Sequence, residues 1–331
     1  MMRTILRLVA KFLFLGLILG YLIYSGHLNP GKLFLFTEMP LFFGLMFANV
    51  ALGMLGLNAV RWWVLLKSLS IHLMFRRVLA ITMISFFFNI SMPGTIAQDA
   101  IRSLYILKEK EKTSQTVPLV MSVILDRFLG FFGVILSFLA GVLWLPEELN
   151  INPIIYYTVW TVGFCSFCGI FTISIFVLPL SEIDQFIVIL ARVPIIGSHL
   201  IQIALALRAY KGKWGVLSIA MGLSILTQVI FVFVMTVGYQ LLTRQSLPFS
   251  VHMFVVPIGE LATILPLTPA GAGIGHVSYD YLYHMFGGKM GADLFNLYFC
   301  MVLLVGSIGG LPYLLIKPKK MNKEDLLTTS Q

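Results

Sequence analysis

Long apolar segments dominate the pattern of hydrophobic and polar positions along this chain. A helix needs roughly 20 apolar residues to cross about 30 Å of hydrocarbon, whereas a barrel strand needs only about ten alternating ones. Six segments have the length and uniformity of a helical crossing, and they cover about residues 9–26, 40–66, 117–145, 154–179, 214–242 and 293–316. The pattern therefore predicts an all-α polytopic membrane protein with six full transmembrane helices.

Two further apolar stretches, about 78–92 and 251–268, are shorter or interrupted. They run into breaks rich in proline and glycine, "NISMPGTIAQD" and "LPLTPAGAGIGH", and an amphipathic stretch follows each. Irregular backbone at membrane depth is tolerated only where protein or a water-filled cavity satisfies its polar groups. We predict two re-entrant hairpins, about 78–107 and 251–287, which makes eight hydrophobic segments in one membrane domain spanning 1–331. The residues expected to form the breaks are Pro93, Gly94, Pro269, Gly271 and Gly273.

Composition agrees with this class, and charge adds an orientation. With 59% hydrophobic and 11% charged residues, the chain lies far outside the range of soluble domains. Its net charge of +9 comes from basic residues scattered between apolar segments, which indicates topology and not nucleic-acid binding. With six crossings, 19 of the 23 lysines and arginines, Arg61 among them, fall on or near one face, while Lys32, Arg244 and Lys289 fall opposite and Arg127 lies within a span.

This asymmetry predicts a protein of the cytoplasmic (inner) membrane with both termini in the cytoplasm. The first hairpin then opens from the cytoplasm and the second from the outside, although the charges do not determine how deep either hairpin goes. The N-terminal segment has no small-x-small cleavage site near its end, so it is expected to be a retained first span. A segment at about 180–213 is either an amphipathic helix on the inner surface or an ordinary connector, and 317–331 is a short cytoplasmic tail.

The first hairpin and the span after it carry charges that need partners. Gln98 and Asp99 precede Arg102 by four and three positions, so the three share one helical face. Asp126 and Arg127 lie two to three turns into the next span, where a charge costs at least about 2.5 kcal/mol unless it is paired or reaches water. Two interpretations stay open. The charges form a structural clasp, Asp99 with Arg127 and Asp126 with Arg102, or they line a site for a polar ligand.

The second hairpin holds Glu260 before its break and His276, Asp280 and His284 after it. The last three share one helical face, but about 12 Å of helix rise between His276 and His284 prevents all three from reaching one ion. We predict no metal site and no cofactor, and the face is either proton-responsive, in contact with a headgroup, or a hydrogen-bonded packing face. The helix starts expected near Thr95 and Gly273 would each offer free N–H groups to an anion. Three neighbouring aromatic residues are expected to be interfacial anchors: Tyr279, Tyr281 and Tyr283.

Three ordered motifs resemble a known family. The run N-x-x-x-P-G…Q-D-A-x-R, then S-V-x-x-D-R, then P-x-x-P-A-G-x-G, is similar to the transmembrane, flippase-like family of lysylphosphatidylglycerol synthases. The resemblance implies a single polytopic domain with two re-entrant elements that moves a lipid between leaflets. The chain differs in having Ala270 where many members have glycine, and His276 where many have an acid. No aminoacyltransferase domain accompanies it, so it is not expected to make lysylphosphatidylglycerol itself.

The combined interpretation is a flippase-like transporter of a phospholipid or another anionic or isoprenoid lipid, and not an enzyme. Arg102 and Arg127 would hold the phosphate, and Asp99 and Asp126 would orient them. No GxxxxGK[ST] motif is present, so transport would be passive or ion-coupled. The residues expected at the headgroup cavity are Asn89, Gln98, Asp99, Arg102, Asp126, Arg127, Glu260, His276 and Asp280.

Two other functions remain open from the sequence. One is a membrane-embedded transferase acting on a polyisoprenyl lipid, with Asp99 as base. The other is a non-transporting partner subunit or a solute transporter. In the leading interpretation the partner is a membrane lipid, with no nucleic acid, and His276 or Glu260 would carry a coupled proton.

Overall fold

The computed structural model describes residues 35–91, 96–109, 116–145, 210–264 and 270–315, with a few isolated positions between 24 and 163. This part of the chain is helical and contains no strand, which confirms the predicted all-α class. Four of its helices are long and apolar enough to cross a membrane, and they match four of the predicted spans: Pro40–Ser68, Pro118–Leu143, Trp214–Thr243 and Gly291–Leu315. The predicted spans at 9–26 and 154–179, most of the segment at 180–213, and the tail lie outside the described residues.

The first long helix is continuous but not uniform. After the short helix α2 (Leu35–Glu38), it consists of α3 (Pro40–Ala48), a π-helical segment η2 (Asn49–Leu57) and α4 (Asn58–Ser68). Proline suits the start of α3 because the first N–H of a helix has no partner within the helix. A π-helical turn holds more residues than an α turn, so η2 determines the direction in which the side chains of α4 point.

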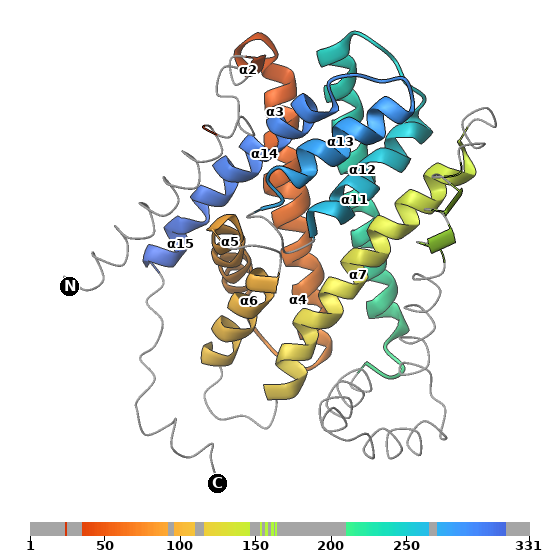
Figure 1. The fold of residues 1–331 in the computed structure, drawn as a ribbon. Coiled ribbons are helices and arrows are strands. Elements are labelled where there is room, and N and C mark those ends of the chain that lie inside the picture. The colour runs from red at the N-terminus through yellow and green to blue at the C-terminus, as the bar shows by residue number, and fades with distance from the viewer. Residues whose placement is uncertain are drawn as a thin grey trace.

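Two pairs of shorter helices occupy the positions of the predicted hairpins. The first pair is α5 (Phe75–Ser91) and α6 (Ile96–Glu109), and the second is α12 (Phe249–Ile264) and α13 (Ile274–Met285). Within each pair the two helices are in contact, and Figure 1 shows α5 beside α6 at lower left and α12 beside α13 at upper right. The predicted helix starts near residues 95 and 273 are therefore confirmed.

The second break requires glycine for a conformational reason. Gly271 and Gly273 have φ of 75° and 79°, a left-handed region that side chains with a Cβ rarely adopt. Between Ala270 and Ile274 the chain thus turns sharply enough to start a new helix. The remaining predicted break residues, Pro93, Gly94 and Pro269, lie outside the described residues.

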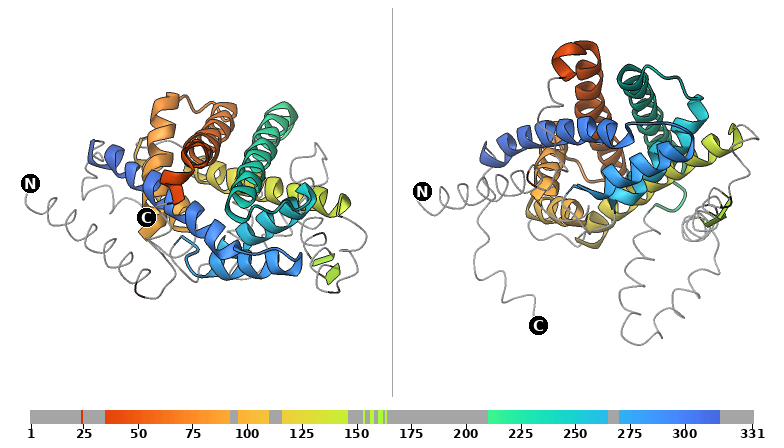
Figure 2. Two further views of the ribbon diagram at one scale, coloured as in Figure 1. Left: turned by 90° about the horizontal axis from the view of Figure 1, so that it is seen from above. Right: turned by 45° about the horizontal axis from the view of Figure 1, so that its top comes forward.

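Helix α7 (Thr116–Leu143) runs diagonally through the assembly and contacts α4, α6, α11 (Trp214–Thr243) and α12. On the opposite side, α14 (Gly291–Ile308) and α15 (Gly310–Leu315) pass across α5, as the right-hand view of Figure 2 shows. The two helices cross closely at Gly306, since a Cβ at this position would lie only 2.2 Å from Cδ1 of Ile90. Small residues at such crossings let membrane helices pack closely. Close packing matters because the lipid provides no hydrophobic drive for helix association.

Close packing of α7 on α12 gives a first prediction. A Cβ at Gly141 would lie 2.7 Å from the backbone carbon of Met253, whereas Gly222, on the outer face of α11, has nothing within 4 Å. Gly141→Val should destabilise the protein by about 1–3 kcal/mol through overpacking. Gly222→Val makes the same change in helix propensity without the clash. We expect thermal unfolding in detergent micelles to begin several degrees lower for Gly141→Val only, and equal shifts for the two variants would contradict this packing.

Candidate functional site

A polar cavity of about 210 Å³ lies between helices α4, α5, α6, α7, α11, α12 and α14. The residues that flank both breaks line it: Asn89 and Gln98 at the first, Ile264 and Ala270 at the second. Residues that flank the two breaks, about 170 positions apart in the sequence, therefore line one cavity. Its volume is below the roughly 300–1,000 Å³ of pockets for drug-sized ligands, so it has room for a polar group or roughly ten waters.

The cavity brings together most of the site residues that the sequence predicts. Within the described part of the chain, its charged lining consists of three arginines and three acids: Arg61, Arg102, Arg127, Asp99, Asp126 and Glu260. Asn89 and Gln98 line it too, and Oδ1 of Asn89 has no hydrogen-bond partner among the described residues. Their roles toward a ligand stay predictions.

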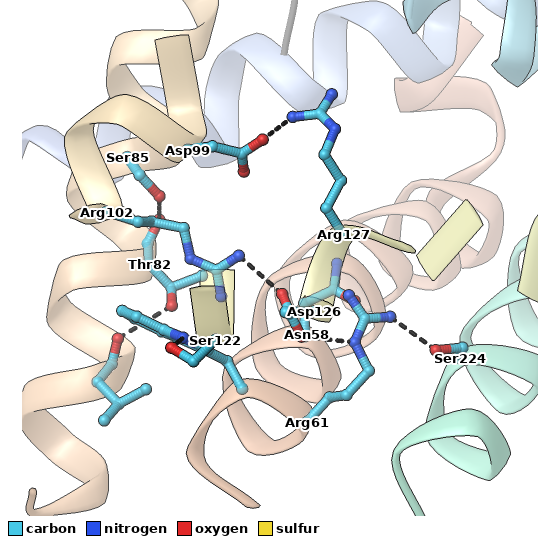
Figure 3. Close-up of polar contacts among 12 residues, drawn as sticks. Asn58, Arg61, Thr82, Ser85, Asp99, Arg102, Ser122, Asp126, Arg127 and Ser224 are labelled. Carbon is cyan, nitrogen blue, oxygen red and sulfur yellow. Dashed lines mark hydrogen bonds and ion pairs between the residues drawn. The ribbon is translucent and has the colours of Figure 1, made fainter. Parts of the chain in front are cut away.

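Asp126 on α7 is the centre of the charged group. Its Oδ1 accepts a hydrogen bond from Nε of Arg61 at 2.7 Å, and its Oδ2 accepts one from Nη1 of Arg102 at 2.8 Å (Figure 3). The side chain of Asp126 is only 1% exposed. Charge-assisted bonds of this kind are roughly twice as strong as neutral ones, and one carboxylate between two guanidinium groups leaves one positive charge in excess.

Arg61 ties this group to α11. Its Nη1 donates to Oγ of Ser224 at 2.9 Å, so α4, α7 and α11 meet at one side chain. The guanidinium lies close to Gly130 of α7, where a Cβ would be 3.2 Å from Nη2. With two of its three nitrogens bound to the protein, Arg61 is a fixed partner of Asp126.

Arg102 on α6 is held differently. Its guanidinium carbon lies 4.2 Å from the centre of the Trp62 ring, and Nε1 of Trp62 donates to Oγ of Ser122 at 3.1 Å. Only Nη1 of Arg102 is used, because Nε and Nη2 are buried without a hydrogen-bond partner in the described part of the chain. Buried donors without acceptors are costly, and an anion in the cavity could satisfy them.

A second ion pair lies beside this group. Nη1 of Arg127 on α7 donates to Oδ2 of Asp99 on α6, and the two side chains are 24% and 22% exposed. Figure 3 shows the pair above the link from Arg102 to Asp126. Both pairs expected of a clasp, Asp99 with Arg127 and Asp126 with Arg102, are therefore present. Helix α6 supplies the acid of one pair and the arginine of the other, and α7 supplies their partners.

Glu260 forms the other end of the polar lining. Its Oε2 accepts a hydrogen bond from Nε2 of Gln228 on α11 at 3.0 Å. Oε1 of Gln228 is buried and has no donor among the described residues. Aromatic rings line the cavity with this carboxyl group, among them Phe231, Phe295 and Tyr298.

Two predicted site residues on α13 do not line the cavity. Nδ1 of His276 accepts from the backbone N–H of Gly273 at 3.3 Å, and its Nε2 lies 3.4 Å from Oδ1 of Asn296. Asp280 accepts from the backbone N–H of Ala292 at 3.4 Å. Among the described residues, no three His, Cys, Asp or Glu side chains gather into a possible metal site.

The expectation that Tyr279 and Tyr283 are interfacial anchors is wrong. Both are fully buried, and only Tyr281 is exposed. The hydroxyl of Tyr279 donates to the backbone oxygen of Val256, and that of Tyr283 lies 2.8 Å from Nδ1 of His252. The reason is tertiary, because α13 packs against α12 and α14 and turns these two rings inward.

Among the cavity residues that the sequence analysis does not identify, Arg61 and Gln228 matter most for the charges and hydrogen bonds. Arg61 was assigned to the cytoplasmic face because it lies near the end of its apolar segment. Gln228 is a strongly polar side chain in the middle of the span at 214–242, and polar groups at that depth usually face a cavity or another helix. That signal could have identified Gln228, whereas nothing local to α4 distinguishes Arg61 from the other basic residues at span ends.

The different burial of the two aspartates gives a second prediction. Asp126→Asn leaves two buried guanidinium groups side by side, and losing one partner of a buried ion pair costs about 3–5 kcal/mol. Asp99→Asn breaks a partly exposed pair, where the cost is about 0–1 kcal/mol. We expect the melting temperature in detergent to fall much further for Asp126→Asn. A larger fall for Asp99→Asn would contradict the prediction that the buried pairs of Asp126 contribute more to stability than the pair of Asp99 and Arg127.

Comparison with known proteins assigns the chain to a family. The family model described as the lysylphosphatidylglycerol synthase TM region matches residues 2–294, which include all three motifs and the described helices up to the start of α14. No curated protein and no solved structure matches the chain significantly. With four apolar helices of membrane-spanning length and a match over most of its length, this chain is a transmembrane protein that belongs to the lysylphosphatidylglycerol synthase TM region family.

Proposed function

We propose that the protein moves a phospholipid, or a related anionic or isoprenoid lipid, between the leaflets of the cytoplasmic membrane. The headgroup passes through the cavity while the lipid tails stay in the bilayer. The observation that carries this proposal is Arg102, a lining residue of the cavity whose two buried donors have no acceptor among the described residues. A family named for a lipid synthase agrees with a lipid ligand.

In this proposal Arg102 and Arg127 bind the phosphate, and Asp99 and Asp126 orient them. Arg61 has a separate task. Removing one partner of a buried ion pair costs about 3–5 kcal/mol, but Asp126 keeps Arg61 when Arg102 turns toward a phosphate. The exchange of partners then leaves no carboxylate unpaired, so a headgroup can enter and leave at moderate cost.

The volume of the cavity limits which part of the lipid can enter it. About 210 Å³ accommodates a headgroup and not a whole lipid, whose tails need the surrounding hydrocarbon. Asp99 is paired with Arg127. This engagement favours an orienting role for the carboxylate over that of a catalytic base, and thus transport over the transferase alternative.

The two helix pairs act as re-entrant hairpins in this proposal. Helix α6 has 14 residues and α13 has 12, so at 1.5 Å per residue they measure about 21 and 18 Å and are too short to cross about 30 Å of hydrocarbon. The charge pattern supports an orientation with both termini in the cytoplasm, in which α5 and α6 enter from that side and α12 and α13 from the outside. Oppositely inserted breaks at one central site are the arrangement that alternating access uses.

Transport is passive or coupled to an ion, because the sequence has no phosphate-binding loop of the GxxxxGK[ST] type. Glu260 is the stronger of the two candidate proton carriers because it lines the cavity, whereas His276 lies behind it on α13.

The arginines provide the test. Purified protein is placed in liposomes that contain a trace of phospholipid with a fluorophore on its acyl chain, and translocation is followed by quenching the outer-leaflet label. Arg102→Gln and Arg127→Gln should each lower the rate about tenfold or more, since a hydrogen bond to a charged group contributes about 1.5–3 kcal/mol. The matched control is Arg76→Gln, which changes an exposed arginine in the first turn of α5. It should translocate lipid at the same rate as the protein without substitutions.

Folding is checked separately by the melting temperature of each variant. Folded Arg102→Gln and Arg127→Gln proteins that both translocate lipid at the unchanged rate would overturn the assignment of these arginines. An unchanged protein that translocates no labelled phospholipid would overturn the transport proposal itself.

A further inference from the structure

The two ends of the cavity lack opposite hydrogen-bonding partners. At one end, Arg102 has two buried donors, Nε and Nη2, without acceptors in the described part of the chain. At the other end, the buried Oε1 of Gln228 has no donor among the described residues. Buried polar groups are nearly always satisfied in proteins, so a ligand that accepts at one end and donates at the other would complete the site.

The acceptor end is defined by Glu260 and Gln228. A carboxylate only accepts hydrogen bonds, so the amide of Gln228 turns its Nε2 toward Glu260 and its Oε1 away. Within the described residues, Glu260 forms no ion pair with a lysine, arginine or histidine. The segments 92–95 and 265–269, which follow α5 and α12 in the sequence, contain no charged residue. Within the described part of the chain, a carboxylate and an amide oxygen thus line the cavity together without a cation.

Aromatic rings line the same cavity. Phe231 and Tyr298 line the cavity with ring centres 4.9 Å apart, and Phe295 and Phe299 line it with nearly parallel rings. Aromatic faces carry partial negative charge and attract cations, ammonium groups in particular. The aromatic lining therefore favours a positive group in the cavity.

When Glu260 is ionised, the charges of the cavity are balanced in total but separated in space. Asp126 with its two arginines leaves one positive charge in excess, the pair of Asp99 and Arg127 is neutral, and Glu260 adds one negative charge. A ligand with no net charge, negative at the Arg102 end and positive at the Glu260 end, keeps this balance. A ligand with a net negative charge would leave an excess charge in a low-dielectric site, which is unfavourable.

Helix α11 contacts both the arginine group and the acceptor end. Ser224 contacts Arg61 of the arginine group, and Gln228, four residues later on the same face, contacts Glu260. Four residues of helix rise about 6 Å. Because Ser224 and Gln228 lie about one turn apart on α11, the arginine group and the pair of Glu260 and Gln228 contact neighbouring positions of one helix.

From this juxtaposition of unpaired donors, unpaired acceptors and aromatic rings, we infer that the cavity selects a zwitterionic headgroup. The phosphodiester lies at Arg102, and a primary ammonium group lies between Glu260, Oε1 of Gln228 and the aromatic rings. The inference rests on the proposed lipid transport and specifies which headgroup is carried.

The test compares two probes in the same liposomes. Translocation is measured for phosphatidylethanolamine, which carries a phosphate and an ammonium group, and for phosphatidylglycerol, which carries only the phosphate. Both have the fluorophore on the acyl chain, so the headgroups are unmodified. The unchanged protein should move the ethanolamine lipid about tenfold faster, as expected for a hydrogen-bonded charged group.

Two variants remove the acceptor end. Glu260→Gln removes the charge at nearly constant shape, and Gln228→Met removes the amide oxygen at similar volume. Both should bring the ratio of the two rates close to one, mainly by slowing the ethanolamine lipid. The control is Glu38→Gln at an exposed glutamate outside the cavity, which should keep the ratio of the unchanged protein.

The outcomes separate the two proposals. If the unchanged protein moves neither lipid, the transport proposal fails. If it moves both lipids at equal rates, or moves phosphatidylglycerol faster, transport stands and the zwitterion inference is overturned. If the unchanged protein prefers the ethanolamine lipid but folded Glu260→Gln and Gln228→Met proteins keep the preference, the assignment of the ammonium site is overturned.

Discussion

The carboxylate of Asp126, buried between the guanidinium groups of Arg61 and Arg102, is the interaction on which the rest of the structure depends. In a membrane interior a lone charge is costly, so three charged side chains at this depth must find one another. They come from three helices, α7, α4 and α6, and the bond from Arg61 to Ser224 adds α11. One network thus determines how four helices sit around the cavity.

The same network provides for a change of state. Because Asp126 has two partners, Arg102 can leave it for a ligand while Arg61 stays, which a single buried ion pair would not permit without leaving a bare charge. Glu260 and Gln228 supply the complementary end on α12 and α11. The proposed transport and headgroup selection follow from one feature, the separation of excess positive and excess negative charge within a small cavity.

Local patterns predicted the elements well where the physics is local. The membrane spans follow from the length of apolar segments, and the starts of α6 and α13 follow from proline and glycine breaks. The pairing of Asp99 and Arg102 with the two charges of α7 could be expected from the spacing of residues on one helical face. The burial of Tyr279 and Tyr283 could not, because it depends on the helices that cover α13.

The sequence by itself determined that this is a helical membrane protein, where prolines and glycines interrupt its helices, and which charged residues need partners. These features are local because the energetic cost of polar groups in hydrocarbon is set residue by residue. Only the tertiary structure decided that Arg61 completes the group around Asp126, that residues flanking both breaks line one cavity, and that His276 and Asp280 lie outside it. Those outcomes depend on contacts between helices far apart in the chain, and no local pattern encodes the direction in which two such helices face each other.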